Sequence, residues 1–220
     1  MSATENQVCV LVSGGCDSAV LLARTLESGA RVLPLYVRCG LRWEPAERYW
    51  LTRLLRAMRS PQLLPLRIIE VPVRAIYGAH WSVSGRGVPG AYSDDQAVEL
   101  PGRNVLLLSH AAVLCARQGI ASIAMGTLEG NPFRDASPAF AARLSACLAQ
   151  ALGKPIRIVM PLRRFTKRQV MRLAGGVPLA LTFSCVNPRG QRHCGACNKC
   201  AERRYAFHTA GLTDPTPYAG

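Results

Sequence analysis

The chain has 220 residues, and 27 basic against 13 acidic residues give it a formal net charge of +14 at pH 7. Hydrophobic residues make up 49%, enough to bury a sizeable core, which excludes a disordered protein. No apolar run reaches the roughly 18 residues that a membrane span requires, so we expect no membrane partner. The positive charge favours anionic ligands such as nucleotides, pyrophosphate or RNA.

Strand and helix patterns alternate along most of the chain. Residues 8–12 form a continuous apolar run, which is typical of a parallel strand buried on both faces. The other expected strands are 32–37, 66–71, 120–125 and 156–160, and the expected helices are 18–26, 43–58, 104–117, 139–152 and 166–174. This alternation predicts right-handed β–α–β units and an α/β fold with a doubly wound, mostly parallel five-stranded sheet.

Two segments depart from the alternation. Residues 76–102 are rich in glycine and proline and are too long for an ordinary connection, so we expect a lid or substrate loop there. Beyond residue 176 the periodicity is lost and cysteines become frequent. We therefore predict an α/β domain over residues 1–176 and a small C-terminal subdomain over residues 177–220.

The string Ser-Gly-Gly-Cys-Asp-Ser, residues 13–18, joins the first strand to the first helix. Phosphate binds at this junction of an α/β sheet, because free N–H groups and the helix dipole stabilise negative charge there. Ser13 and Ser18 add hydroxyl donors. Asp17 is unexpected beside an anion unless it holds a divalent cation or orients the loop. The string lacks the Gly-Lys-Ser ending of a Walker loop, which argues against γ-phosphoryl transfer.

Four of the nine cysteines cluster near the C-terminus with the spacing C-x8-C-x2-C-x2-C: Cys185, Cys194, Cys197 and Cys200. Four thiolates at this spacing complete a closed tetrahedral Zn²⁺ shell of the structural kind. An iron–sulfur cluster and a redox pair are the alternatives. We interpret His193 as a neighbour of this site and not as a ligand. The other cysteines are expected to be small buried residues: Cys9, Cys16, Cys39, Cys115 and Cys147.

Residues 13–18 resemble the pyrophosphate loop (PP-loop) of the ATP pyrophosphatases, which cleave ATP between its α and β phosphates. This loop occurs together with Pro-Gly-Arg-Asn at residues 101–104 and with the four-cysteine spacing. Cys185-Val-Asn also resembles a Cys-Tyr-Asn segment that precedes such a cysteine loop. Over residues 8–207 the combination is similar to the 7-cyano-7-deazaguanine synthase family of the queuosine pathway. The resemblance implies an adenine nucleotide alpha hydrolase-like, Rossmann-like fold with a C-terminal zinc-binding subdomain.

The same resemblance implies an ATP-dependent carbon–nitrogen ligase. The carboxylate of a 7-carboxy-7-deazaguanine-like substrate would attack the α-phosphate of ATP, and ammonia would displace AMP to give an amide. A second ATP would activate the amide oxygen, and loss of AMP would leave a nitrile. ATP, Mg²⁺ and Zn²⁺ are the expected cofactors. We expect a cytoplasmic homodimer, and residues 1–7 carry no basic segment of a secretory signal.

Individual residues receive roles by the same resemblance. Catalytic roles fall to Ser13, Asp17, Arg103 and Lys167. ATP would contact Val12, Ser13, Gly14, Gly15, Cys16, Asp17, Ser18, Ala19, Tyr36, Val37, Gly126 and Lys167. The segment after Gly126 is shorter than in the family and lacks its Tyr-Pro-Asp-Cys-Arg, so the matching substrate residues are Arg103, Glu129, Phe133 and Asp135. Asn104 would cap the helix that it opens, and Thr166 is the expected N-cap of the helix at 166–174.

Three other functions stay open. In the first, the enzyme forms the same adenylate but delivers it to an amine other than ammonia, on a protein or a small molecule. Transfer of sulfur to tRNA would need a sulfur-carrying cysteine, whereas these cysteines fit a metal site better. The third is a zinc-ribbon RNA-binding protein with a degenerate nucleotide site, which the C-terminal arginines would suit: Arg189, Arg192, Arg203 and Arg204. The intact loop at residues 13–18 argues against this function.

Overall fold

The computed structural model describes residues 6–219, and within that range the chain forms a five-stranded, fully parallel sheet. The strands are β1 (Gln7–Leu11), β2 (Arg31–Arg38), β3 (Arg67–Glu70), β4 (Ser122–Ala124) and β5 (Arg157–Val159). The predicted doubly wound α/β fold is confirmed. Residues 1–5, on which the expectation of no secretory signal partly depends, lie outside the described range.

The strand order is β3-β2-β1-β4-β5, so the winding direction reverses beside β1. Within β1, Val10 is paired with Pro34 of β2 on one side and with Ala124 of β4 on the other. In open parallel sheets, ligands bind beyond the carboxyl ends of the strands at such a reversal. The topology therefore predicts a ligand site at the segments that follow β1 and β4.

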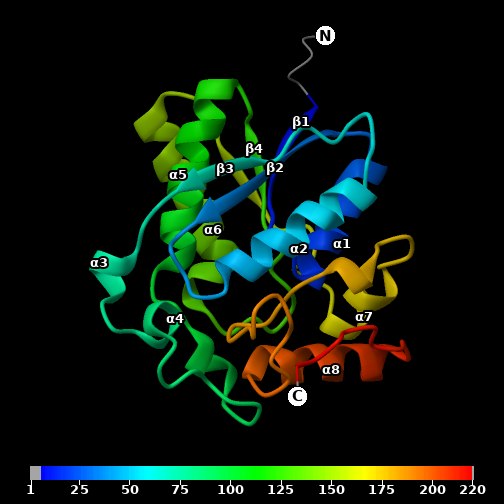
Figure 1. Cartoon of the computed structure of the whole chain (residues 1–220). Coiled ribbons are helices and arrows are strands. Elements are labelled where there is room, and N and C mark those ends of the chain that lie inside the picture. Colours follow the sequence, from blue (N-terminus) through cyan, green and yellow to red (C-terminus); the bar gives the residue numbers. More distant parts are fainter. Residues whose placement is uncertain (1–5, 220) are drawn as a thin grey trace.

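Helices cover both faces of the sheet (Figure 1). The helices over one face are α1 (Cys16–Glu27), α2 (Glu44–Ala57) and α7 (Lys167–Arg172), and those over the other are α5 (Arg103–Gln118) and α6 (Pro138–Leu152). Leu21, Leu51 and Val170 belong to the core of the first face, while Leu108 and Ile123 belong to the core of the second. All five are fully buried, which anchors the helices to the sheet.

Some helix boundaries differ from those predicted. α1 begins at Cys16, two residues before the predicted start, and α5 begins at Arg103 after Gly102, whose φ is 70°. Thr166 is the N-cap of α7, as predicted, and Gln169 completes a capping box with it. Among residues 6–219, no helix is long and apolar enough to cross a membrane.

The expected lid at residues 76–102 is partly helical. It contains all of α4 (Trp81–Ser84) and the 3₁₀ helix η1 (Asp95–Val98), and its first two residues are the end of the short helix α3 (Arg74–Tyr77). The backbone N–H of Asn198 donates to Pro89 O at 3.0 Å, and its side-chain amide donates to Ser93 O at 2.7 Å. These bonds fasten the segment to the cysteine-rich part of the chain, so it forms a fixed wall in this structure.

The C-terminal segment contains a helix that the sequence patterns did not predict. This helix, α8 (Asn198–Ala210), packs against α7 (Figure 1), and Met171, Ala206 and Phe207 form a small core between the two. Cys197 is its N-cap residue and Cys200 lies in its first turn. The segment is therefore joined closely to the α/β part of the chain. The division at residues 176 and 177 stays a prediction.

Candidate functional site

A cavity of about 380 Å³ lies at the carboxyl ends of β1, β2 and β4, where the strand order reverses. Its volume falls in the range of small-molecule sites, roughly 300–1,000 Å³. Segments far apart in the sequence line it: the PP-loop, the end of β2, the start of α5, the 3₁₀ helix η2 (Arg134–Ala136), Lys167 of α7, residues 183–186 and one face of α8. The cavity thus combines both predicted parts of the chain.

The PP-loop is shaped by its own side chains and by Gly14. The φ of Gly14 is 81°, a left-handed conformation that favours glycine, and its carbonyl accepts from the Phe183 N–H at 2.8 Å. The Ser18 hydroxyl accepts from the Ser13 N–H at 3.3 Å and donates to Gly15 O at 3.0 Å. The first N–H groups of α1 have no intrahelical partners, so the helix end presents donors suited to an anion.

Most residues predicted to contact ATP do line the cavity. They are Val12, Ser13, Gly15, Cys16, Asp17, Ser18, Tyr36, Val37, Gly126 and Lys167. Gly14 and Ala19 lie behind this lining, Gly14 against Leu51 and Ala19 in the core under α1. Their contribution is to the shape of the loop and to its packing.

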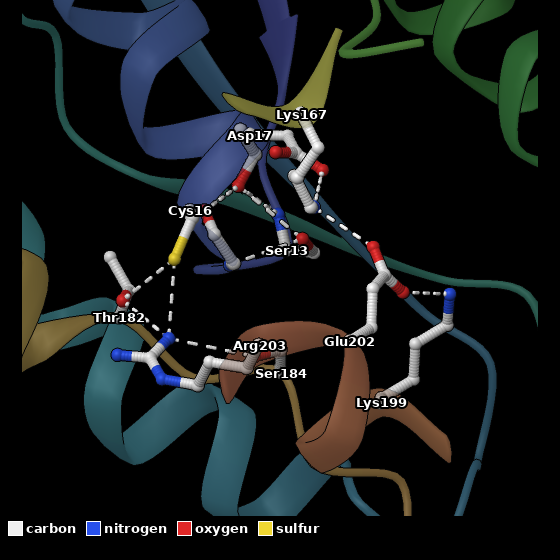
Figure 2. Close-up of polar contacts among 11 residues, drawn as sticks. Ser13, Cys16, Asp17, Lys167, Thr182, Ser184, Lys199, Glu202 and Arg203 are labelled. Atoms are coloured by element: carbon white, nitrogen blue, oxygen red, sulfur yellow. Dashed lines mark hydrogen bonds and ion pairs between the residues drawn. The ribbon is translucent and has the colours of Figure 1, made fainter. Parts of the chain in front are cut away.

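A chain of ion pairs crosses the cavity beside the PP-loop (Figure 2). Lys167 Nζ lies 2.6 Å from Asp17 Oδ2 and 3.0 Å from Glu202 Oε1, and Glu202 Oε2 lies 2.5 Å from Lys199 Nζ. Burial alone would lower the pKa of Lys167, but the charges of Asp17 and Glu202 outweigh it and raise that pKa. Burial would raise the pKa of Glu202, and the two lysines instead lower it to about 2. Lys167 and Glu202 are therefore charged at neutral pH.

Two buried oxygens in the cavity lining have no hydrogen-bond partner among residues 6–219: Asp17 Oδ1 and Thr127 Oγ1. An unsatisfied buried polar atom costs about 1–3 kcal/mol, more when it is charged. Asp17 thus pairs with Lys167 through Oδ2, and its Oδ1 is available to a ligand.

Tyr36 and Glu47 form a buried pair in the lining of the cavity. The Tyr36 hydroxyl donates to Glu47 Oε2 at 2.6 Å, and both residues are buried. Burial raises the pKa of the Glu47 carboxyl to about 7, although the Tyr36 hydrogen bond and the charge of Arg103 oppose this. Arg103 also lines the cavity, and its Nε is buried without a partner among the described residues. The sequence analysis did not identify Glu47, because its spacing on α2 matches no motif.

Replacing Glu47 with glutamine should flatten part of the pH dependence of stability. The folded protein holds the Glu47 proton more tightly than the unfolded chain, so stability falls as the pH rises from about 4.5 to about 7. The expected loss is about 3 kcal/mol over that window, and Glu47→Gln should not show it. Urea unfolding of both proteins at several pH values measures the difference. Parallel stability curves would show that Glu47 does not titrate in this window.

The four clustered cysteines lie close enough to bind one ion. All are buried, and their Sγ atoms lie within 4.8 Å of one another. The Sγ atoms are 3.8 Å apart in the pair Cys185 and Cys197 and 3.9 Å apart in the pair Cys194 and Cys200. A tetrahedral ion with Zn–S bonds of about 2.3 Å requires sulfurs about 3.8 Å apart. An iron–sulfur cluster fits less well, because its cysteines bind different irons and lie farther apart.

His193 is buried beside this group. Its Nε2 accepts from the Ser184 N–H at 3.2 Å, and its ring centroid is 4.4 Å from that of Phe183. Burial and the charge of Arg203 lower the pKa of His193 to about 4, so the ring is neutral. These contacts agree with its interpretation as a neighbour of the metal site.

The remaining cysteines divide into two kinds. Cys9, Cys16, Cys39 and Cys115 are buried, as predicted. Cys147 is exposed on the outward side of α6, so the prediction for this residue was wrong. Its apolar neighbours in the sequence suggested a core position, but Leu144 and Leu148 face the core whereas Cys147 lies on the solvent-facing side of the helix.

Comparison with known proteins assigns the chain to a family. A sequence model described as "Queuosine biosynthesis protein QueC" matches residues 7–211. The chain belongs to the QueC family. The 7-cyano-7-deazaguanine synthase of Anaeromyxobacter dehalogenans (strain 2CP-C) is 33% identical, and the match covers 96% of this chain and 94% of that protein. The 7-cyano-7-deazaguanine synthase of Methanothrix thermoacetophila is 31% identical, and the match covers 96% of this chain and 97% of that protein.

Solved structures support the fold. A structure titled as a 4-thiouridine synthetase–RNA complex with bound ATP has a TM-score of 0.53 and 14% identity, covering 94% of this chain and 50% of that one. A predicted subunit of tRNA methyltransferase from Methanocaldococcus jannaschii has a TM-score of 0.51 and 16% identity, covering 77% and 74%. At these identities the likeness concerns the fold alone.

The predicted substrate residues of this QueC-family chain are only partly brought together. Arg103, Phe133 and Asp135 line the cavity, whereas Glu129 is exposed and lies outside its lining. Asp135 Oδ2 accepts from the Asn104 N–H at 2.9 Å, and Oδ1 accepts from the Asn104 side-chain amide at 3.0 Å. The predicted capping role of Asn104 was therefore wrong, because Asp135 Oδ2 accepts the helix N–H and the Asn104 side chain instead holds Asp135.

Four residues of α8 to which the sequence analysis gave no role in this site line the cavity: Lys199, Glu202, Arg203 and Ala206. They follow the last cysteines at helical spacing, a signal that would have required predicting α8. In this QueC-family chain the cysteine-rich segment therefore also forms one wall of the cavity.

Proposed function

We propose that the protein is an ATP-dependent ligase that converts a 7-carboxy-7-deazaguanine-like acid and ammonia into 7-cyano-7-deazaguanine, with AMP and pyrophosphate as products. One observation carries the proposal: a PP-loop, with Asp17 and Lys167, opens onto a 380 Å³ cavity in a QueC-family chain. The relatives named 7-cyano-7-deazaguanine synthase match the chain over nearly its whole length, which supports the same reaction.

The first step is adenylation of the substrate carboxylate. A carboxylate oxygen attacks the α-phosphorus of ATP, the bond from that phosphorus to the bridging oxygen breaks, and pyrophosphate leaves. The N–H groups at the start of α1 and the hydroxyls of Ser13 and Ser18 hold the phosphates, and Tyr36 and Val37 border the adenine. Little covalent chemistry is needed from the protein, so catalysis depends on positioning and charge stabilisation.

The ion pairs of Lys167 suit this step. Without nucleotide, the ammonium is held by Asp17 and Glu202. A bound phosphate competes with these carboxylates for Lys167. The free Oδ1 of Asp17 fits a hard divalent cation, which prefers carboxylate oxygens. Mg²⁺ held there by Asp17 would neutralise charge on the triphosphate.

The second step forms the carbon–nitrogen bond. Ammonia attacks the acyl carbon, AMP leaves with the carboxyl oxygen, and a proton is released to give the amide. The amide oxygen then attacks the α-phosphorus of a second ATP, and a second pyrophosphate leaves as the bond to the bridging oxygen breaks. Loss of AMP, which carries away the former amide oxygen, and of the protons on nitrogen leaves the nitrile. Arg103, whose Nε lacks a partner among residues 6–219, suits the carboxylate, and Phe133 offers a ring on which a heterocycle stacks.

The four cysteines fit a structural Zn²⁺ ion. The sulfur spacing matches a tetrahedral shell, and a closed four-thiolate shell leaves no open position for catalysis. Its contribution would be to fasten the start of α8, and with it Lys199, Glu202 and Arg203. Such thiolates need a reducing compartment, which supports a cytoplasmic location.

Product analysis tests the proposal. The protein is incubated with ATP, ¹⁵N-ammonium and 7-carboxy-7-deazaguanine, and products are followed by mass spectrometry. We expect a nitrile containing ¹⁵N, with two AMP and two pyrophosphate molecules formed for each nitrile. One AMP per amide, without nitrile, would instead show that the reaction stops at the amide. Salt-dependent RNA binding without any AMP release would contradict the enzymatic proposal and favour an RNA-binding protein.

A further inference from the structure

We propose that residues 212–219, hereafter the strap, position the Arg203 guanidinium beside the PP-loop and thereby strengthen ATP binding. The inference rests on the proposed function, because it assumes that phosphates bind at this loop. The family match ends at residue 211, so family membership assigns no role to the strap.

Arg203 is tied to the PP-loop by its guanidinium. The residue is 3% exposed and lines the cavity. Its Nη1 lies 3.2 Å from Cys16 Sγ and donates to Thr182 Oγ1 at 2.9 Å (Figure 2), and its Nη2 donates to Leu179 O at 3.1 Å. Cys16 is the first residue of α1, so this cation lies at the helix end where an anion is expected.

The charge balance makes Arg203 important for phosphate binding. Lys167, Lys199, Asp17 and Glu202 carry formal charges that sum to zero, so this cluster adds little net positive field. Among residues 6–219, Asp214 is the carboxylate that lies within 4 Å of Arg203, at 3.6 Å from Nε. The Nη1 edge is directed at the PP-loop. A guanidinium in this orientation stabilises negative charge on the loop.

The strap holds the other edge of the guanidinium through a directed hydrogen-bond chain. Arg203 Nε donates to Thr216 Oγ1 at 2.6 Å, and the Thr216 hydroxyl donates onward to Asp214 Oδ1 at 2.5 Å. The Tyr218 hydroxyl donates to Asp214 Oδ2 at 2.6 Å. Burial would raise the pKa of Asp214, but these hydrogen bonds and the charge of Arg203 lower it, so the acceptor stays ionised.

The sequence of the strap favours an extended conformation with alternate side chains facing the protein. Pro215 and Pro217 keep the residues before them out of the helical conformation, so the strap runs extended beside α8 (Figure 1). Asp214, Thr216 and Tyr218 are partly buried, while the residues between them are exposed. The end of the strap is also anchored, because the Ala219 N–H donates to His193 O at 2.8 Å.

Substitution of Thr216 tests the proposal with matched controls. Thr216→Val keeps the shape but removes the hydroxyl, Thr216→Ser keeps the hydroxyl, and Thr213→Val makes the same change at an exposed strap position. We expect Thr216→Val to raise the KM for ATP about tenfold with kcat within about twofold, because a hydrogen bond to a charged group is lost. Thr216→Ser and Thr213→Val should behave like the unaltered protein.

Direct binding separates this proposal from the proposed function. Calorimetry with α,β-methylene-ATP measures affinity without turnover, while Tm and zinc content report on folding. If the unaltered protein does not bind the analogue, the proposed function fails and the strap proposal fails with it. If it binds and Thr216→Val binds equally well, the strap proposal alone is overturned. Should Thr216→Val not fold, Tyr218→Phe removes the hydroxyl on the other side of Asp214 and should weaken binding about threefold. Unchanged binding by Tyr218→Phe would then overturn the strap proposal.

Discussion

Replacing Asp17 with asparagine should lower the rate of pyrophosphate release from ATP about a thousandfold. The carboxylate holds Lys167 Nζ at 2.6 Å through Oδ2 and offers a buried, unpartnered Oδ1 to a cation, as judged among residues 6–219. An amide of the same shape carries no charge, so it would hold both the ammonium and the cation weakly. A coupled pyrophosphatase assay measures the rate, and the Tm should change by only a few degrees.

Asp94→Asn is the matched control for this variant. Asp94 is exposed in the 76–102 segment and lies outside the cavity lining, so the same chemical change there should leave the rate unaltered. A rate for Asp17→Asn within threefold of the unaltered protein would remove Asp17 from the reaction. An equal loss in the Asp94 variant would point to a general effect of lowered negative charge.

Replacing Cys197 with serine should remove the bound metal and lower the Tm by more than about 10 °C. Cys197 supplies one of the four sulfurs and is also the N-cap residue of α8. With three thiolates, the ion is held weakly, and the start of α8 loses its attachment to the Cys185 segment. Zinc content by atomic emission and Tm by calorimetry measure the two effects.

Cys147→Ser is the control for the metal prediction, because Cys147 is exposed on α6, away from the cluster. It should retain one zinc per chain and an unchanged Tm. A Cys197→Ser protein that keeps its full zinc content would show that the other three cysteines bind the ion without it. Unaltered stability after zinc loss would show that the site does not support the fold.

The sheet and the PP-loop could be predicted because their signals are local. Residues 8–12 form an apolar run, and the glycines, serines and aspartate of the loop follow directly. Chain neighbours alone therefore indicated the strand, the turn and the helix end. The cysteine spacing was equally local, since a C-x2-C step directs two sulfurs to one side of the chain.

The contacts that complete the site could not be predicted in this way. Lys167 is paired with Glu202, and Asp135 caps the helix that begins at Arg103, in each case across more than 30 residues of sequence. Such pairings depend on how helices pack, which hydrophobic periodicity does not specify. The cysteines and charges at the start of α8 also obscured its helical pattern, so its four cavity residues were missed.

The cavity contains residues from positions 11 to 206 of the chain, and this has a consequence for how the protein is made. Of the segments that line the cavity, the glycine-rich turn emerges from the ribosome first and the cysteine-bearing helix last. The pocket therefore cannot be completed during translation until that helix has cleared the exit tunnel. A chain released too early would contain the sheet but lack one whole wall of its binding pocket.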